Sequence, residues 1–224
     1  MISSLETWQI TFFSVAVGLA STIVILPFGI VLAWLFARKE WPLKSAVETA
    51  VLLPLVMPPV STGLILLKIF GRRSPIGRWL YDRGVEVVFN WKGVLIAMAV
   101  MSFPLLVRSV RTSFSEVNPR LEQIAATLGA PGLRIFFVIT IPLAYKGIVA
   151  GALLAFARAL GEFGATILLA GNIPGRTQTL SLAIFNFVQT GKDSEAYFLL
   201  GITVVLAFVF VWFSEWLLRS RKKA

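Results

Sequence analysis

The 224-residue sequence contains neither cysteine nor histidine. These absences exclude disulfides, thiol chemistry, imidazole acid–base catalysis and metal sites built on thiolate or imidazole ligands. No Gly-x-x-x-x-Gly-Lys-Ser/Thr loop occurs either, so the chain lacks a P-loop for ATP. We therefore expect no catalytic residues, no metal site and no cofactor bound by this chain, which favours a protein that is not an enzyme.

Charge is also scarce, because 14% of the residues are charged whereas 57% are hydrophobic and the mean hydropathy is +0.83. A soluble domain is about 25% charged, so the lipid bilayer is the expected solvent. The formal net charge of +10 does not indicate a nucleic-acid partner. Lys and Arg gather at the ends of apolar runs, where membrane proteins place them. We expect contacts with membrane lipids and none with nucleic acid.

Several apolar runs reach or approach the roughly 20 residues that cross the hydrocarbon core of a bilayer. None alternates as a half-buried strand would, and a helix satisfies its own backbone hydrogen bonds in lipid. The pattern predicts an all-α polytopic transmembrane helix bundle of about five spans, forming a single domain over residues 1–224. The expected spans cover about 10–37, 46–70, 93–110, 144–170 and 197–218.

The distribution of basic residues predicts the orientation of the chain. The first apolar run is too long for a cleaved signal and no cationic segment precedes it, so we expect a retained span. With five spans, the larger basic set lies on the side of the C-terminus, which the positive-inside rule assigns to the cytoplasm, and the N-terminus lies outside. The basic loop from Gly71 to Arg83 goes against the rule. The larger set is Arg38, Lys39, Lys44, Arg108, Arg111, Arg120, Arg134, Lys146, Arg219, Arg221, Lys222 and Lys223.

The second run contains Leu-Pro-Leu-Val-Met-Pro-Pro at residues 53–59. Proline removes a backbone donor and clashes with the preceding turn, so this density predicts a kink or a short unwound turn. Both a bend for packing and a hinge near a translocation path remain open. In the fourth run, Gly147 and Gly151 have the spacing that lets helix backbones approach closely.

The longest polar connection, about residues 111–143, contains a short helix candidate. Asn118-Pro119 predicts the helix start, and Gly129 followed by Pro131 predicts its end. An amphipathic helix this short is not stable alone, so it needs a groove in a partner protein or the lipid headgroup surface. Its single apolar stripe consists of Leu121, Ile124, Ala125 and Leu128.

Two opposite charges, Arg158 and Glu162, lie in the fourth run at helical i, i+4 spacing. A charge at membrane depth costs at least about 2.5–3.5 kcal/mol, so these two are expected to pair or to face a cavity. Together with Thr166 they are candidates for an intramembrane site. A structural ion pair and a pore-lining pair both remain open.

Residues 122–142 resemble the cytoplasmic coupling loop of binding-protein-dependent ABC importer permeases. That pattern is Glu-Ala-Ala, three residues, Gly, nine residues and Ile-x-Leu-Pro. Its places are taken here by Gln123, Ile124, Ala125, Gly129, Ile139, Ile141 and Pro142. Gln123 and Ile124 depart from the Glu and Ala of the pattern, but Glu122 places a carboxylate one residue before Gln123. The resemblance implies that an ATPase is contacted through Leu121, Glu122, Gln123, Ile124, Ala125, Leu128, Gly129 and Pro142.

Nearly the whole chain resembles molybdate ABC transporter permeases, notably in Gly-Glu-Phe-Gly-Ala and Asn-Ile-Pro-Gly. The resemblance implies a type I importer permease fold in the bacterial cytoplasmic (inner) membrane and ATP-driven import of molybdate. It also implies a homodimer, a cytoplasmic ABC ATPase dimer carrying ATP and Mg, and an external molybdate-binding protein. A permease for sulfate or tungstate, and an ATP-independent channel or membrane scaffold, are the alternatives. The short helix in the coupling loop argues against the channel, because a channel without an ATPase partner needs no docking helix.

Overall fold

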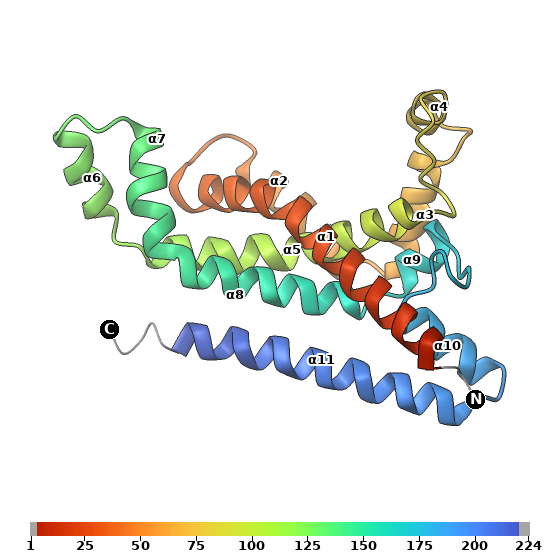
Figure 1. Ribbon diagram of the computed structural model, residues 1–224. Helices are drawn as coiled ribbons and strands as arrows, with labels where there is room; N and C mark the ends of the chain where they lie inside the picture. The colour runs from red at the N-terminus through yellow and green to blue at the C-terminus, as the bar shows by residue number, and fades with distance from the viewer. Residues whose placement is uncertain (1–3, 220–224) are drawn as a thin grey trace.

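The computed structural model describes residues 4–219, and every regular element in that range is a helix (Figure 1). This confirms the all-α prediction. The elements are α1 (Ser4–Arg38), α2 (Lys44–Val56), α3 (Pro59–Phe70), α4 (Pro75–Tyr81), α5 (Trp91–Glu116), α6 (Pro119–Thr127), α7 (Gly132–Ile135), the π-helix η1 (Phe136–Thr140), α8 (Ile141–Leu160), α9 (Gly164–Leu169), α10 (Leu180–Gln189) and α11 (Asp193–Arg219).

Four continuous helical segments are long and apolar enough to cross a membrane. They are Leu5–Arg38, Trp91–Glu116, Gly132–Leu160 and Asp193–Arg219, and the bent pair α2 and α3 makes up to five when it is counted as one span. The structure therefore agrees with a bundle of about five spans.

The second apolar run is broken where the prolines predict it. Helix α2 ends at Val56 and α3 begins at Pro59, and the two axes are bent by 112°. Met57 is extended, with ψ 148°, because a residue before proline is disfavoured in the helical region. The predicted kink is thus a sharp break that turns α3 away from α2.

The fourth run differs from the expectation of one helix from 144 to 170. Helix α8 ends at Leu160, and α9 begins only at Gly164. Phe163 leaves the helical region, with φ −131° and ψ −57°. Arg158 and Thr166, grouped above as one candidate site in a single span, therefore belong to different helices and do not share one helical face.

Helices α1, α5 and α8 pack side by side and form the centre of the bundle (Figure 1). Helix α5 contributes much of the core, including Val94, Met98, Leu106 and Phe114. At Gly151 of α8, an added Cβ would lie 3.0 Å from the Ser109 hydroxyl of α5, so the small residue permits this close approach. The predicted role of Gly151 in helix packing agrees with this contact.

The elements divide between two ends of the bundle (Figure 1). One end, called here the α6 end, holds α6, α7 and the connection between α1 and α2, and α11 finishes toward it. The opposite end, called the α4 end, holds the start of α1 together with α4, α9 and α10. The two ends of the described chain thus lie at opposite ends of the bundle, as an odd number of spans requires.

Candidate coupling surface and intramembrane ion pair

Helix α6 has the local signals that define its two ends. The Asn118 side-chain oxygen accepts a hydrogen bond from the Arg120 backbone N–H at 3.0 Å, and Pro119 occupies the first turn. The helix ends at Thr127, and Gly129 takes a left-handed conformation with φ 85°. Glycine adopts this conformation without the steric cost that other residues incur. The sequence therefore predicted both ends of the helix.

The apolar stripe of α6 faces outward. Leu121, Ile124 and Leu128 are 45%, 57% and 82% exposed, and no residue of α6 is buried. Ala125 is half-buried, whereas Gln123 and Gly129 are exposed. Exposed apolar side chains continue into the next segment at Leu133 and Phe137, which the sequence analysis did not single out. Several large apolar side chains exposed on one short helix are typical of a partner-binding site.

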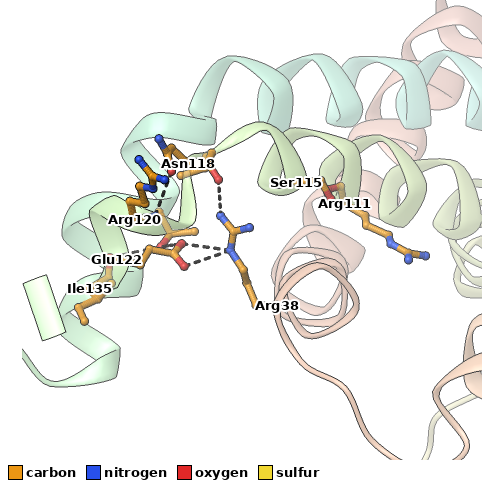
Figure 2. A network of polar contacts seen from close by, with 9 residues as sticks. Arg38, Arg111, Ser115, Asn118, Arg120, Glu122 and Ile135 are labelled. Carbon is orange, nitrogen blue, oxygen red and sulfur yellow. Dashed lines mark hydrogen bonds and ion pairs between the residues drawn. The ribbon is translucent and has the colours of Figure 1, made fainter. Parts of the chain in front are cut away.

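Two predicted coupling residues lie apart from this stripe. Pro142 is exposed but belongs to the first turn of α8. Glu122 is directed inward, where its carboxylate lies 3.1 Å from the Arg38 guanidinium and accepts a hydrogen bond from the Thr140 hydroxyl at 2.7 Å (Figure 2). No sequence signal connects Arg38 to Glu122, since 84 residues separate them.

Arg158 and Glu162 form an ion pair, with 2.8 Å between Nη1 and Oε2. The Glu162 side chain is 1% exposed, and its other oxygen accepts a hydrogen bond from the Ala165 backbone N–H at 2.8 Å. The carboxylate therefore neutralises Arg158 and also caps the first turn of α9, which explains how the chain tolerates a break inside an apolar run.

Helix α9 crosses α3 at very short range. A Cβ at Gly63 would lie 2.7 Å from the Ala165 Cα, and a Cβ at Gly164 would lie 2.8 Å from the Pro59 Cβ. Sequence reasoning missed both glycines, because neither belongs to a Gly-x-x-x-Gly pair. The crossing also buries Thr62 and Thr166, whose hydroxyls have no hydrogen-bond partner within residues 4–219. The two breaks, at 57–58 and 161–163, are thus packed against each other.

A cavity of about 650 Å³ lies at the α4 end of the bundle. Its lining includes two cations, Arg176 and Lys192, one carboxylate, Glu6, and the nearly buried amide of Gln178. A net positive lining of this kind attracts anions. Within residues 4–219, no cluster of three or more Asp or Glu side chains could hold a metal ion.

Comparison with known proteins gives matches along almost the entire chain. Residues 9–223 match the family described as binding-protein-dependent transport system inner membrane component. The chain is 47% identical over 227 residues to the molybdenum transport system permease protein ModB of Escherichia coli (strain K12), covering 100% of this chain and 99% of the relative. It is 35% identical to the sulfate transport system permease protein CysT of the same strain, covering 87% of this chain and 70% of the relative.

Solved structures also resemble the fold. A chain of a bacterial alginate ABC transporter in complex with alginate pentasaccharide-bound periplasmic protein has a TM-score of 0.73 at 18% identity, covering 95% of this chain and 78% of that chain. A chain of the MetNI methionine ABC transporter, in an inward-facing conformation, has a TM-score of 0.65 at 18% identity, covering 98% of this chain and 99% of that chain. At these identities the likeness concerns the fold alone.

Proposed function

Because the chain belongs to the family of binding-protein-dependent transport system inner membrane components, we propose that it is the permease subunit of an ATP-driven molybdate importer. The observation that carries the proposal is the 47% identity to a molybdenum transport permease over 100% of this chain. The helix bundle has the type I ABC importer permease fold, and the chain is a multi-pass inner-membrane protein.

The relatives are permease proteins, which confirms a transport subunit rather than an enzyme. The driving energy comes from a separate ATPase, and substrate arrives on an external binding protein. We propose that ATP and Mg are held by that ATPase, and that the external protein binds molybdate. The outward stripe of α6 supports a docking site for the ATPase, because an exposed apolar helix face fits a hydrophobic groove.

The orientation that fits this scheme has the α6 end in the cytoplasm and the N-terminus outside. Arg38, Lys39 and Lys44 lie in or beside the α1–α2 connection at the α6 end, in agreement with the positive-inside rule. Because the chain has no natural thiol, single cysteines at the exposed Thr127 and Asp82 are unique labels. A membrane-impermeant maleimide on intact spheroplasts should label Asp82→Cys and not Thr127→Cys. The reverse pattern would contradict the orientation.

A homodimer of the permease is the proposed assembly. One bundle of this size offers little room for a gated aqueous path, and α11 exposes large apolar side chains along most of its length. A second copy and lipid are both suited to cover such surfaces. Mass measurement of the detergent-solubilised permease should give two copies of the chain, and a monomer that transports would contradict the assembly.

Selectivity is tested by uptake into proteoliposomes that contain the permease and the ATPase, with the binding protein outside. Labelled molybdate should enter only when ATP and both partners are present. Tungstate and sulfate are the competing substrates, and sulfate has support because a sulfate permease is also a relative. Uptake that prefers sulfate over molybdate would show that the chain is a sulfate permease instead. Uptake that needs neither ATP nor the partners would select a channel.

A further inference from the structure

The end of α1, the α5–α6 link, α6 and the η1–α8 junction meet around Arg38, the last residue of α1 (Figure 2). Its Nη2 donates a hydrogen bond to the backbone oxygen of Val117, directly after α5, at 2.7 Å. Its Nε lies 3.1 Å from Oε2 of Glu122, in the first turn of α6. The hydroxyl of Thr140, at the junction of η1 and α8, donates to Oε1 of the same carboxylate at 2.7 Å.

These groups are shielded from solvent although they lie beside an exposed helix. The side chains of Arg38 and Glu122 are 12% and 18% exposed, and Thr140 is 1% exposed. Separating a shielded ion pair leaves each charge without its partner, which is costly in a poorly solvated site. The carboxylate therefore joins α6 to the end of α1 and to the η1–α8 junction, and Arg38 itself joins α1 to Val117 directly after α5.

Few other contacts attach α6 to the bundle. None of its residues is buried, and its main helix neighbours are the short α7 and η1. Within the described chain, Glu122 is the only α6 side chain with a polar contact beyond the helix and its cap. The links on either side, 117–118 and 128–131, are outside the regular helices, so no helical hydrogen bonds stiffen them when α6 is displaced. The 117–118 link is held by Arg38 itself, through the Val117 oxygen.

We propose that Arg38, Glu122 and Thr140 form a latch that makes α6 move as one body with the ends of α1, α5 and α8. The proposal rests on the proposed function, in which an ATPase displaces α6. Glu122 is then a positioning residue rather than a docking contact. With the latch closed, a displacement of α6 reaches the membrane-spanning helices. With the latch open, the flanking links absorb the displacement and ATP hydrolysis no longer drives transport.

The latch itself is tested on the permease alone, so the result does not depend on transport. A spin label on Thr127→Cys, an exposed position near the end of α6 in a chain without other thiols, reports the mobility of the helix. Glu122→Gln and Arg38→Gln should each raise the label mobility several-fold. The double variant should raise it no further than either single variant, because both changes open the same contact.

Two matched variants complete this measurement. Arg120→Gln removes a charge from the same turn of α6, but its exposed side chain is outside the latch, so the mobility should stay at the starting value. The charge-reversed pair Arg38→Glu with Glu122→Arg should lower the mobility again. Unchanged mobility in Glu122→Gln, or an equal rise in Arg120→Gln, would overturn the latch.

The functional consequence is measured as the ratio of molybdate imported to ATP hydrolysed in the reconstituted transporter. Glu122→Gln should keep the ATPase bound and hydrolysing, while the ratio falls several-fold and recovers in the charge-reversed pair. Loss of ATPase binding in Glu122→Gln, with normal coupling in Arg38→Gln, would identify Glu122 as a docking contact and overturn the proposal. If the unaltered transporter imports no molybdate, the proposed function fails, and the label measurement still decides the latch.

Discussion

Two arginine–carboxylate pairs, at different places in the bundle, stabilise different levels of structure. Arg158 and Glu162 are four residues apart, and Glu162 also caps the turn that follows it. Arg38 and Glu122 are 84 residues apart and join separate helices. The first pair maintains a local break in the chain, whereas the second maintains the position of an exposed helix. The comparison shows that the same chemistry organises backbone in one region and tertiary arrangement in the other.

The surroundings of the two pairs differ in the same way. Around Glu162, backbones approach so closely that Gly63 and Gly164 have no room for a side chain. Around Glu122, the helix exposes its apolar stripe and buries none of its residues. We therefore expect substitutions at the α8–α9 break to lower stability, and substitutions in the exposed apolar stripe of α6 to lower partner binding while the bundle remains folded.

The largest expected effect is that of Glu162→Leu. The substitution leaves Arg158 and the Ala165 N–H without their partner, and breaking a buried ion pair in this way costs about 3–5 kcal/mol. The thermal stability of the solubilised permease should fall accordingly. Glu162→Gln, which keeps an oxygen for the Ala165 N–H, should lose less thermal stability than Glu162→Leu. If the Leu variant is as stable as the unaltered protein, the pair does not maintain the break, and the pore-lining interpretation gains.

The next effect is expected for Ile124→Asp on the exposed stripe. A carboxylate in a hydrophobic groove should cost the ATPase complex about 2 kcal/mol or more, which corresponds to roughly a thirtyfold loss of affinity. Binding of the purified ATPase to the permease in nanodiscs measures this loss. Thr127→Asp introduces the same charge on the same helix outside the stripe and should bind nearly normally. Equal losses in both variants would mean that the stripe is not the docking surface.

A smaller effect is expected where α3 crosses α9. Gly63→Ala places a methyl group 2.7 Å from the Ala165 Cα, and overpacking of this kind costs about 1–3 kcal/mol. The melting temperature of the solubilised permease should fall. Gly201→Ala on α11, where nothing lies within 4 Å of the added Cβ, is the matched control and should not lower it. A stable Gly63→Ala variant would show that the crossing can relax.

The smallest effect is expected for Asn118→Ala, which removes the cap of α6. Loss of such a cap costs about 1 kcal/mol, so amide hydrogen exchange in the first turn should accelerate about fivefold. Asn118→Asp keeps an acceptor for the Arg120 N–H, so the amide hydrogens of the first turn should exchange as slowly as in the unaltered protein. If both variants exchange alike, contacts other than the cap determine the stability of the first turn.

The sequence predicted those parts of the fold that depend on a few neighbouring residues. Prolines 58 and 59 produced the expected break, and Asn118 and Gly129 marked the two ends of α6. The break at 161–163 escaped prediction, because the run around it stays apolar on both sides and contains no proline. At this break the Glu162 side chain accepts a hydrogen bond from the Ala165 N–H, which stabilises the start of a new helix. The spacing of residues along the sequence does not distinguish such a break from a continuous helix.

By itself, the sequence determined the solvent, the helical class, the approximate number of spans and the short amphipathic helix, because each depends on composition or on spacing along one segment. Tertiary structure alone decided that Glu122 is directed inward to Arg38, that α3 crosses α9 at two glycines, and that the α6 stripe remains uncovered in the chain. Those contacts join residues distant in sequence, and their energies depend on distances and burial that only the folded arrangement sets.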